Sequence, residues 1–257
     1  MFMKQMKFFL VALMAVVMGM SVTSCMNGDD NTQVNDLPVL GKVKDRFLGL
    51  TFTSLDGFTF KSKNTVEGTT NFMPGDFIVA TCSYDTEVDI DYTTNTINAT
   101  IGSTEKISGN AVHSTTKAED EGEHPSYVSD RGVISITDLK PAMIDNYNLL
   151  VPLQYFAFEK IASHTFFMVY YSDENELKGK TDLKLFLRHT STEEKAKETY
   201  RAFSYRVFDI RRAIEAYKNA NEERYLSNIT IVSEANSSNN DVPKTTTTTP
   251  VTYTFRE

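Results

Sequence analysis

The chain has 257 residues, with 26 basic and 34 acidic side chains and two cysteines. Its net charge of −8 excludes the strongly basic surface that nucleic-acid-binding domains use, so nucleic acid is not an expected partner. The length suffices for one large β domain or two small domains.

The first 24 residues have the features of a secretory signal peptide. Lys4 and Lys7 precede an apolar stretch, residues 8–20, and small polar residues then lead to Cys25. The apolar stretch has about 13 residues, whereas a membrane-spanning helix needs roughly 20, so we expect cleavage rather than a stable span. Cleavage would remove two lysines and no acid, which changes the net charge to −10.

Cys25 ends the motif Val22-Thr23-Ser24-Cys25, which resembles a lipobox. Signal peptidase II needs small residues before the cysteine that carries a thioether-linked diacylglycerol. Two acyl chains on one residue give stable anchoring. We therefore predict lipidation of Cys25, a membrane as partner through that lipid, and a cell-envelope location. The alternative is a secreted soluble protein in which Cys25 is incidental.

Residues 25–36 are predicted to form a lipidated tether. Asp29 and Asp30 resemble the short acidic signal that sends lipoproteins of some Gram-negative anaerobes to the outer face of the outer membrane. We expect an outer-membrane lipoprotein exposed at the cell surface, and the alternative is an ordinary solvated tether. Once Cys25 is lipidated, Cys82 is the remaining thiol, so no intramolecular disulfide is expected and stability must come from packing.

Residues 37–113 are predicted to form a small β domain. Leu48, Leu50 and Phe52 alternate with small or polar residues, and Asp56-Gly57 then lies between apolar runs, which is a strong hairpin signal. Apolar residues at every second position predict three further strands in residues 78–84, 88–92 and 97–101. In this pattern Cys82 is a core residue. Roughly five strands without a convincing helix favour an OB-like barrel.

The apolar pattern stops between Ser114 and Arg131. The acidic run that begins at Glu119 and ends at Pro125 is too charged to bury. We therefore predict that residues 114–131 form a linker or a long surface loop between two domains.

Residues 132–257 are predicted to form a β-sandwich with one short helix. Alternating or continuous apolar runs predict strands in residues 133–136, 166–171, 183–188, 203–207, 229–231 and 251–255. Asp209 can cap a helix that carries an apolar stripe at Ile210, Ala213, Ile214 and Tyr217. The threonine-rich residues 243–250 are expected to be an exposed connection before the last strand. The fold class is therefore all-β.

This order of features resembles the NigD-like lipoproteins. The resemblance depends on the lipobox, the Leu55-Asp56-Gly57 hairpin, and the two strand sequences in residues 183–189 and 203–209. It covers most of the mature chain and implies an N-terminal OB-like domain followed by a C-terminal β-sandwich. It also implies a protective or immunity role of the kind proposed beside bacteriocin genes, but it carries over no catalytic residue.

Asp85, Glu87, Asp89 and Asp91 occur at every second position and would share one face of a strand. A calcium site is one interpretation. Neighbours on one strand face are about 6.7 Å apart, while calcium lies about 2.4 Å from its oxygen ligands, so one ion could recruit about two of these acids. A solvated acidic side of a half-buried strand is the favoured interpretation.

The four histidines, His113, His124, His164 and His189, form no i, i+4 pair and no HExxH motif. His189 is interpreted as a surface or structural imidazole at the end of a strand. The mature chain has neither a Gly-x-Ser-x-Gly elbow nor a phosphate-binding glycine loop. We therefore predict no catalytic, cofactor-binding or metal-binding residue.

The sequence favours a non-catalytic envelope protein that binds a protein or glycan ligand or protects the cell, in the manner of bacteriocin immunity. The first alternative is a structural subunit of a fimbria or surface layer. An enzyme without a recognisable motif is the second alternative.

Overall fold

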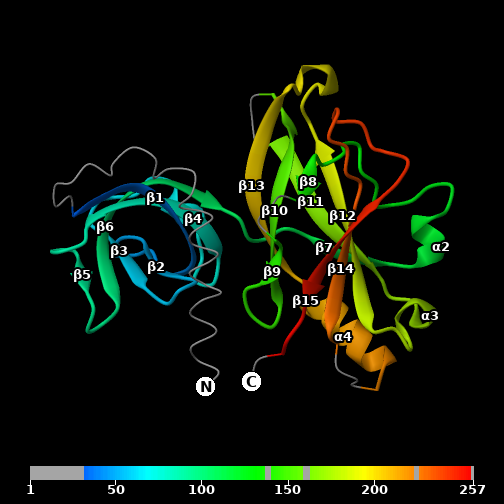
Figure 1. Ribbon diagram of the computed structural model, residues 1–257, viewed down its shortest axis with the longest axis horizontal. Helices are drawn as coiled ribbons and strands as arrows, with labels where there is room; N and C mark the ends of the chain where they lie inside the picture. Colours follow the sequence, from blue (N-terminus) through cyan, green and yellow to red (C-terminus); the bar gives the residue numbers. More distant parts are fainter. Residues whose placement is uncertain (1–31, 137–139, 159–162, 223–225, 256–257) are drawn as a thin grey trace. The chain divides into compact units, whose positions relative to one another are not determined.

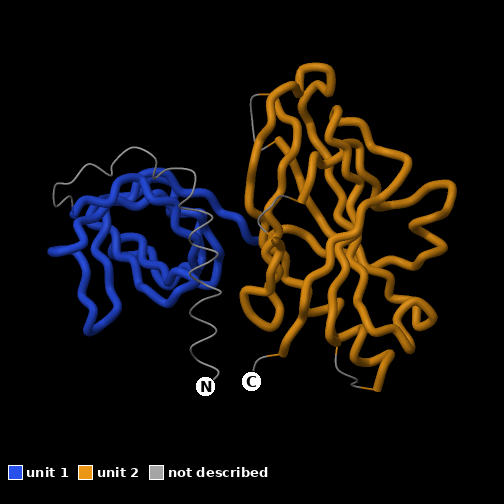
Figure 2. The backbone as a smooth tube through the Cα atoms, viewed as in Figure 1, with its two compact units in different colours: residues 1–108 blue, residues 109–257 orange. Residues whose placement is uncertain are grey.

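The computed structural model describes residues 32–136, 140–158, 163–222 and 226–255. The fold is all-β, as predicted, and the chain divides into two compact units, one ending at Ser108 and one beginning at Gly109 (Figure 2). The predicted signal peptide, residues 1–24, and the predicted lipidation site Cys25 lie outside the described residues. Within the described ranges, no helix is both long enough and apolar enough to cross a membrane.

The first unit is a closed five-stranded barrel with one short extra strand (Figure 1). Its elements are β1 (Gln33–Asp45), β2 (Thr51–Ser54), β3 (Thr59–Ser62), η1 (Thr69–Asn71), β4 (Phe77–Asp85), β5 (Ile90–Asp91) and β6 (Thr96–Lys106). β1 pairs with β2 and β4, β3 pairs with β2 and in parallel with β6, and β6 pairs with β4. This closure matches the predicted OB-like barrel.

The Asp56-Gly57 turn joins β2 and β3, as the sequence predicts. Gly57 has a φ of 94°, a left-handed conformation that suits glycine. The two strands place Phe52 and Phe60 in the core, where their rings stack with centroids 5.2 Å apart. The predicted core position of Cys82 is also confirmed, and burial raises the pKa of its thiol to about 12.

Two expectations for the barrel are wrong. Residues 33–36, predicted to be tether, belong to β1, where Gln33 and Val34 pair with Asp85 and Tyr84 of β4. Leu48, predicted to lie on the core face, is 98% exposed because β2 begins at Thr51.

The second unit is a β-sandwich. Its elements are β7 (Val112–Thr115), α2 (Lys117–Asp120), β8 (Ser135–Ile136), β9 (Ala142–Met143), β10 (Asn148–Ala157), β11 (His164–Tyr171), α3 (Glu174–Leu177), β12 (Asp182–Ser191), η3 (Lys195–Lys197), β13 (Tyr200–Asp209), α4 (Arg211–Ala220), β14 (Asn228–Ser233) and β15 (Thr247–Thr252). One sheet has the order β13-β10-β8, with β9 also on β10, and the other has the order β15-β14-β12-β11-β7. Residues of both sheets form one apolar core.

Residues 114–131 are not a linker between the two units. β7 pairs in parallel with β11 and so begins the sandwich before the predicted boundary. α2 starts at a capping box made by Thr116 and Glu119. Two acids of this segment have close partners: Asp120, with a side chain 4% exposed, accepts a bond from Arg188 at 2.8 Å, and Glu119 belongs to the capping box. Glu121 and Glu123 are exposed.

The predicted helix is α4, and its stripe of Ala213, Ile214 and Tyr217 is buried. Asp209 lies one residue before the N-cap and accepts a bond from the backbone N–H of Arg211 at 3.0 Å. The threonine run is not a free connection, because residues 247–252 pair with β14 as an edge strand. β-branched threonines suit such a strand, and an edge position tolerates Pro250.

The strand predicted in residues 203–207 is part of β13, but the aromatic row that begins at Phe203 is not the row that faces the sandwich core. Phe203 is 38% exposed, while the alternate residues Ala202 and Phe208 belong to the sandwich core. A one-residue change in phase exchanges the two faces of a strand, and the aromatic residues on both faces of β13 hide that phase in the sequence.

Candidate functional site

A group of buried polar side chains lies where β11 begins and β12 ends. This buried polar cluster consists of Arg131, His164, His189, Glu193, Glu198 and Asn240. Its members come from five segments of the second unit: the chain before β8, the first residue of β11, the end of β12, the loop from β12 to β13, and the loop from β14 to β15. The cluster is therefore assembled by the sandwich fold and not by one local motif.

The strand period places both histidines inside the sandwich. His164 precedes Phe166 by two residues, and His189 follows Leu187 by two residues, so each continues an inward-facing row. The β11–β12 register sets Phe166 opposite His189, whose rings stack with centroids 4.3 Å apart. His189 is 1% exposed, so it is the structural imidazole of the sequence interpretation and not a surface residue. The sequence interpretation of four scattered histidines missed the contact between His164 and His189.

The hydrogen bonds of the histidines form a chain. His189 Nδ1 is 3.2 Å from the carbonyl oxygen of Gly132, and its Nε2 is 3.0 Å from His164 Nδ1. Burial, followed by the charge of His164, lowers the pKa of His189 to about 3, while the bond to Gly132 opposes the shift. His189 is therefore neutral at pH 7. Since a carbonyl oxygen only accepts, His189 carries its proton on Nδ1 and accepts at Nε2.

This tautomer of His189 determines which ring nitrogen of His164 donates the hydrogen bond between them. Its Nδ1 must donate to His189, so its Nε2 faces Glu193 Oε2 at 3.1 Å. The same carboxylate oxygen accepts from the backbone N–H of Phe158 at 2.8 Å. The side chains of His164 and Glu193 are 0% and 7% exposed. A proton on Nε2 would make this contact an ion-paired hydrogen bond, whereas a bare Nε2 would put two acceptor atoms in contact.

Glu198 is held by its own partners. Arg131 Nε donates to both of its oxygens, at 2.9 and 2.8 Å, and Asn240 Nδ2 donates to Oε2 at 2.6 Å. The side chains of Arg131 and Glu198 are 8% and 0% exposed. Arg131 also donates to the backbone carbonyl of Glu193 at 2.9 Å, which connects the two acidic residues.

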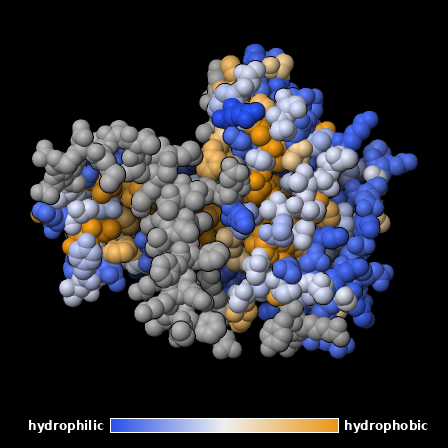
Figure 3. Space-filling view, viewed as in Figure 1, coloured by the Kyte–Doolittle hydropathy of each residue, from blue (hydrophilic) through white to orange (hydrophobic). Residues whose placement is uncertain are grey.

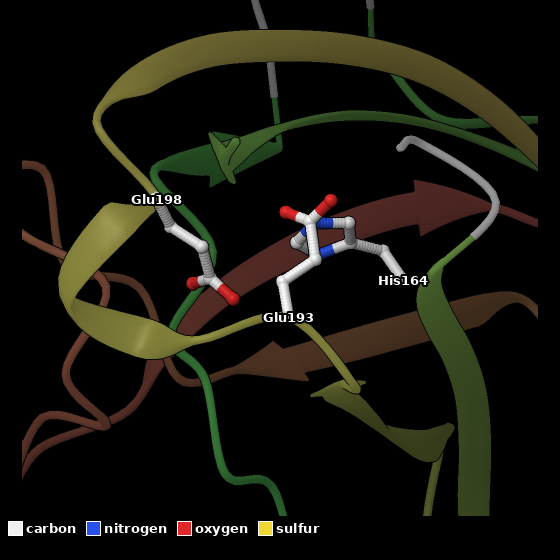
Figure 4. Close-up of side chains that lie close together, drawn as sticks. All are labelled: His164, Glu193 and Glu198. Carbon is white, nitrogen blue, oxygen red and sulfur yellow. The ribbon is translucent and has the colours of Figure 1, made fainter. Parts of the chain in front are cut away.

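Three of these residues have the chemistry and spacing of metal ligands. One ligand atom each from His164, Glu193 and Glu198 lie within 4.8 Å of one another. Figure 4 shows the imidazole and the carboxylate of Glu193 close together, with the side chain of Glu198 beside them. A nitrogen and two carboxylates form a donor set that suits zinc.

The predicted acidic face in the barrel does not exist as a continuous strand. β4 ends at Asp85, and Glu87 and Asp89 lie in the following turn. Asp89 accepts from the backbone N–H of Asp85 at 2.9 Å and pairs with Lys63 at 2.6 Å, while Asp91 accepts from the backbone N–H of Thr93 at 2.8 Å. These acids stabilise turns. Val88 and Tyr92, expected in the core, are 78% and 70% exposed for the same reason.

The other two histidines, His113 and His124, lie outside the buried polar cluster. His113 stacks on Tyr127, with ring centroids 4.4 Å apart, and His124 is exposed. The predicted lipidation site, Cys25, is outside the described residues.

Large apolar side chains are exposed at one end of the barrel. Phe47, Leu48 and Met73, which are 81%, 98% and 65% exposed, form what we name the barrel-end patch. The first two lie between β1 and β2, and Met73 lies between η1 and β4. The two regions are joined by Arg46, which donates to the carbonyl oxygen of Thr70. Val43 in β1 also bonds the chain before β4, because its N–H donates to Asp76 and its carbonyl accepts from Gly75, both at 2.8 Å.

A second apolar region lies on the sandwich. On the face shown in Figure 3, apolar residues gather along the course of β10 and β13. Tyr200 and Phe203 of β13 are 42% and 38% exposed. Both are less exposed than any residue of the barrel-end patch.

No protein-family model and no curated protein sequence matches the chain. Solved structures do. A "Putative lipoprotein" from Bacteroides fragilis is 22% identical, with a TM-score of 0.69 over 88% of this chain and 100% of that chain. An uncharacterized protein from Parabacteroides merdae is 14% identical, with a TM-score of 0.53 over 86% of this chain and 100% of that chain.

A NigD-like immunity protein from Bacteroides caccae is also similar in structure. It is 13% identical, with a TM-score of 0.50 over 87% of this chain and 93% of that chain. At such identities the likeness shows a shared fold. The fold that the resemblance to the NigD-like lipoproteins implies is therefore confirmed.

Proposed function

We propose that this protein is a NigD-like cell-envelope lipoprotein that acts as a non-catalytic binding or protective module. The observation that carries the proposal is the fold shared, over more than four-fifths of this chain, with the "Putative lipoprotein" and the NigD-like immunity protein. The order of charge, apolar stretch and cysteine at the N-terminus supports it independently. In this account Cys25 carries the lipid, and Asp29 and Asp30 direct the protein to the outer surface of the outer membrane.

The barrel-end patch is the proposed contact with the ligand. Large apolar side chains that are exposed on neighbouring loops can mark an interaction site, and the loop between the first two strands is a binding loop of OB-fold proteins. The chain around the patch is held in place: the Asp45 carboxylate accepts from the backbone N–H groups of Arg46 and Phe47, at 2.6 and 3.0 Å. A pre-ordered apolar surface fits a protein ligand of the kind that an immunity protein would bind.

Replacement of Cys25 tests the anchor. We expect Cys25→Ala to abolish labelling by a radioactive fatty acid and to release the protein from the membrane fraction. The matched control is Cys82→Ala, which removes the buried thiol of the barrel and should leave labelling unchanged. Fatty-acid labelling of the Cys25→Ala protein would refute the lipoprotein assignment.

The surface location has a separate test. The double variant Asp29→Ala, Asp30→Ala should lose digestion by external protease in intact cells, at an unchanged total amount of protein. Equal digestion of both forms would mean that the two acids are only part of a tether.

The protective role is tested by challenge of cells with the supernatant of competing strains. Cells without the gene should be more sensitive, and the wild-type gene should restore growth. The variant Phe47→Ser, Leu48→Ser should fail to restore it at the same surface amount, whereas Val88→Ser, Tyr92→Ser at another exposed turn should succeed. Equal survival with and without the gene against every supernatant would remove the protective role.

A further inference from the structure

We propose that the buried polar cluster binds one divalent transition-metal ion, zinc by its donor chemistry, through His164 Nε2, Glu193 Oε2 and a carboxylate oxygen of Glu198. The proposal concerns the sandwich alone and does not depend on the proposed function.

The orientation of His164 is the first argument. A ligating histidine almost always donates its other ring N–H to a fixed acceptor, which sets its tautomer. Here Nδ1 donates to His189 at 3.0 Å, and His189 is itself held by the carbonyl of Gly132 at 3.2 Å. Nε2 is therefore the ring nitrogen directed at Glu193, and it is the atom that a metal ion would bind.

The short separation between His164 and Glu193 is the second argument. Nε2 faces a buried carboxylate oxygen at 3.1 Å, and an unprotonated Nε2 would leave two acceptor atoms in contact unless a positive charge lies between them. Either a proton or a metal ion must supply the positive charge. Zinc lies about 2.0–2.2 Å from nitrogen and carboxylate ligands, so in a tetrahedral site two such ligands are roughly 3.4 Å apart.

Glu198 makes the metal ion the better occupant than a lone proton. A carboxylate has about four lone-pair positions, and Arg131 and Asn240 fill three of those of Glu198. The fourth position is on Oε1, and a carboxylate oxygen of Glu198 lies within 4.8 Å of the ligand atoms of His164 and Glu193. Arg131 and Asn240 then act as the outer hydrogen-bond partners that orient ligating carboxylates.

The donor set decides the class of metal. One imidazole nitrogen with two carboxylates suits zinc and related transition metals. Calcium prefers six to eight oxygen ligands and does not fit a site with a nitrogen donor. The three protein ligands come from β11 and from the loop between β12 and β13, so a bound ion would fix that loop to the sheet.

Zinc stoichiometry tests the proposal. The full chain, purified in detergent and stripped with a chelator, is incubated with zinc chloride, separated from free metal and analysed by elemental mass spectrometry. We expect about one zinc ion per chain and a rise in Tm of several degrees. His164→Gln and Glu193→Gln should each lose the ion, whereas the exposed controls His124→Gln and Glu123→Gln should keep it.

A second measurement needs no variant, so misfolding of a variant cannot hide the answer. On addition of zinc, the ring-nitrogen NMR resonances of His164 should shift, while those of His124 stay in place. A folded wild-type chain that binds no zinc at tenfold excess would overturn the proposal and leave a proton between His164 and Glu193. Zinc binding that His164→Gln and Glu193→Gln leave unchanged, or that leaves the His164 resonances in place, would equally overturn it.

Discussion

The barrel and the sandwich bury different kinds of side chain. In the barrel core, aliphatic and aromatic residues surround Phe52, Phe60 and Cys82, and the ion pairs lie toward the surface, such as Lys63 with Asp89. In the sandwich, Arg131 and Glu198 are paired in the interior, with side chains 8% and 0% exposed. The stability of the barrel core therefore depends on apolar packing, while that of the sandwich core also depends on a matched pair of buried charges.

This difference has a consequence for how each unit tolerates change. Apolar cores lose stability in proportion to the contacts that are removed. A buried charge that loses its partner keeps its full desolvation penalty, so one substitution can affect the whole cluster. The sandwich should thus be sensitive to charge, and the barrel to shape.

The largest single-residue effect is expected at Arg131. Its replacement in Arg131→Gln leaves the buried carboxylate of Glu198 without its charged partner, at a cost of about 3–5 kcal/mol in the free energy of unfolding of the sandwich. Urea denaturation followed by tyrosine fluorescence and circular dichroism measures the loss. The control is Lys63→Gln in the barrel, where the ion pair is more exposed and the loss should stay below about 1 kcal/mol. Similar losses in the two variants would break the distinction between the units.

Shape sensitivity in the barrel is tested at Gly41. A Cβ at this position would lie 2.4 Å from Phe52 Cδ2 and 2.7 Å from the carbonyl oxygen of Thr53. Gly41→Ala should therefore destabilise the barrel by about 1–3 kcal/mol through overpacking. Gly102→Ala is the matched control, since its Cβ would meet the exposed side-chain hydroxyl of Thr81 and neither a core ring nor a close backbone atom. Equal unfolding midpoints for wild type and Gly41→Ala would contradict this description of the core.

A smaller effect is expected at Thr116, which caps α2. The Thr116 hydroxyl accepts from the backbone N–H of Glu119 at 3.2 Å, and the Glu119 carboxylate accepts from the backbone N–H of Thr116 at 3.1 Å. Thr116→Ala should lower the stability of the sandwich by about 1 kcal/mol, while Thr116→Ser should preserve it. If the alanine variant unfolds at the wild-type urea concentration, residues 114–131 contribute less to the sandwich than the structure indicates.

Periodicity predicted those parts of the fold in which one face is apolar and the other polar. The row of Leu183, Leu185 and Leu187 and the stripe on α4 are both found in the core. The Asp56-Gly57 hairpin was predictable because its turn requires left-handed backbone at Gly57.

Other parts of the fold could not be predicted, because one sequence pattern is compatible with two different local structures. Acids at every second position, as in residues 85–91, occur on a solvated strand face and in a turn that uses their carboxylates as hydrogen-bond acceptors. Residues 114–131 contain charges that look unsuited to burial, and their partners, such as Arg188, are far away in sequence.

The buried polar cluster was also not predictable as a whole, because its members are far apart in the sequence. His164 and His189 each continue an apolar row at a spacing of two, which is a signal for an inward position that the sequence interpretation did not use. The position of His164 beside Glu193 and Glu198 depends on the β11–β12 register and on the loop after β12, so it becomes visible only in three dimensions.

The sandwich begins at Gly109, and we expect it to need the charged segment before residue 132 in order to fold. Expression of two fragments, 109–257 and 132–257, tests it directly. The longer fragment retains β7, Asp120 and Arg131, so it should show dispersed amide resonances and one cooperative thermal transition. The shorter fragment lacks the partner strand of β11 and leaves Arg188 and Glu198 without these partners, so it should aggregate or remain molten. Two equally stable folded fragments, or two unfolded ones, would contradict the account.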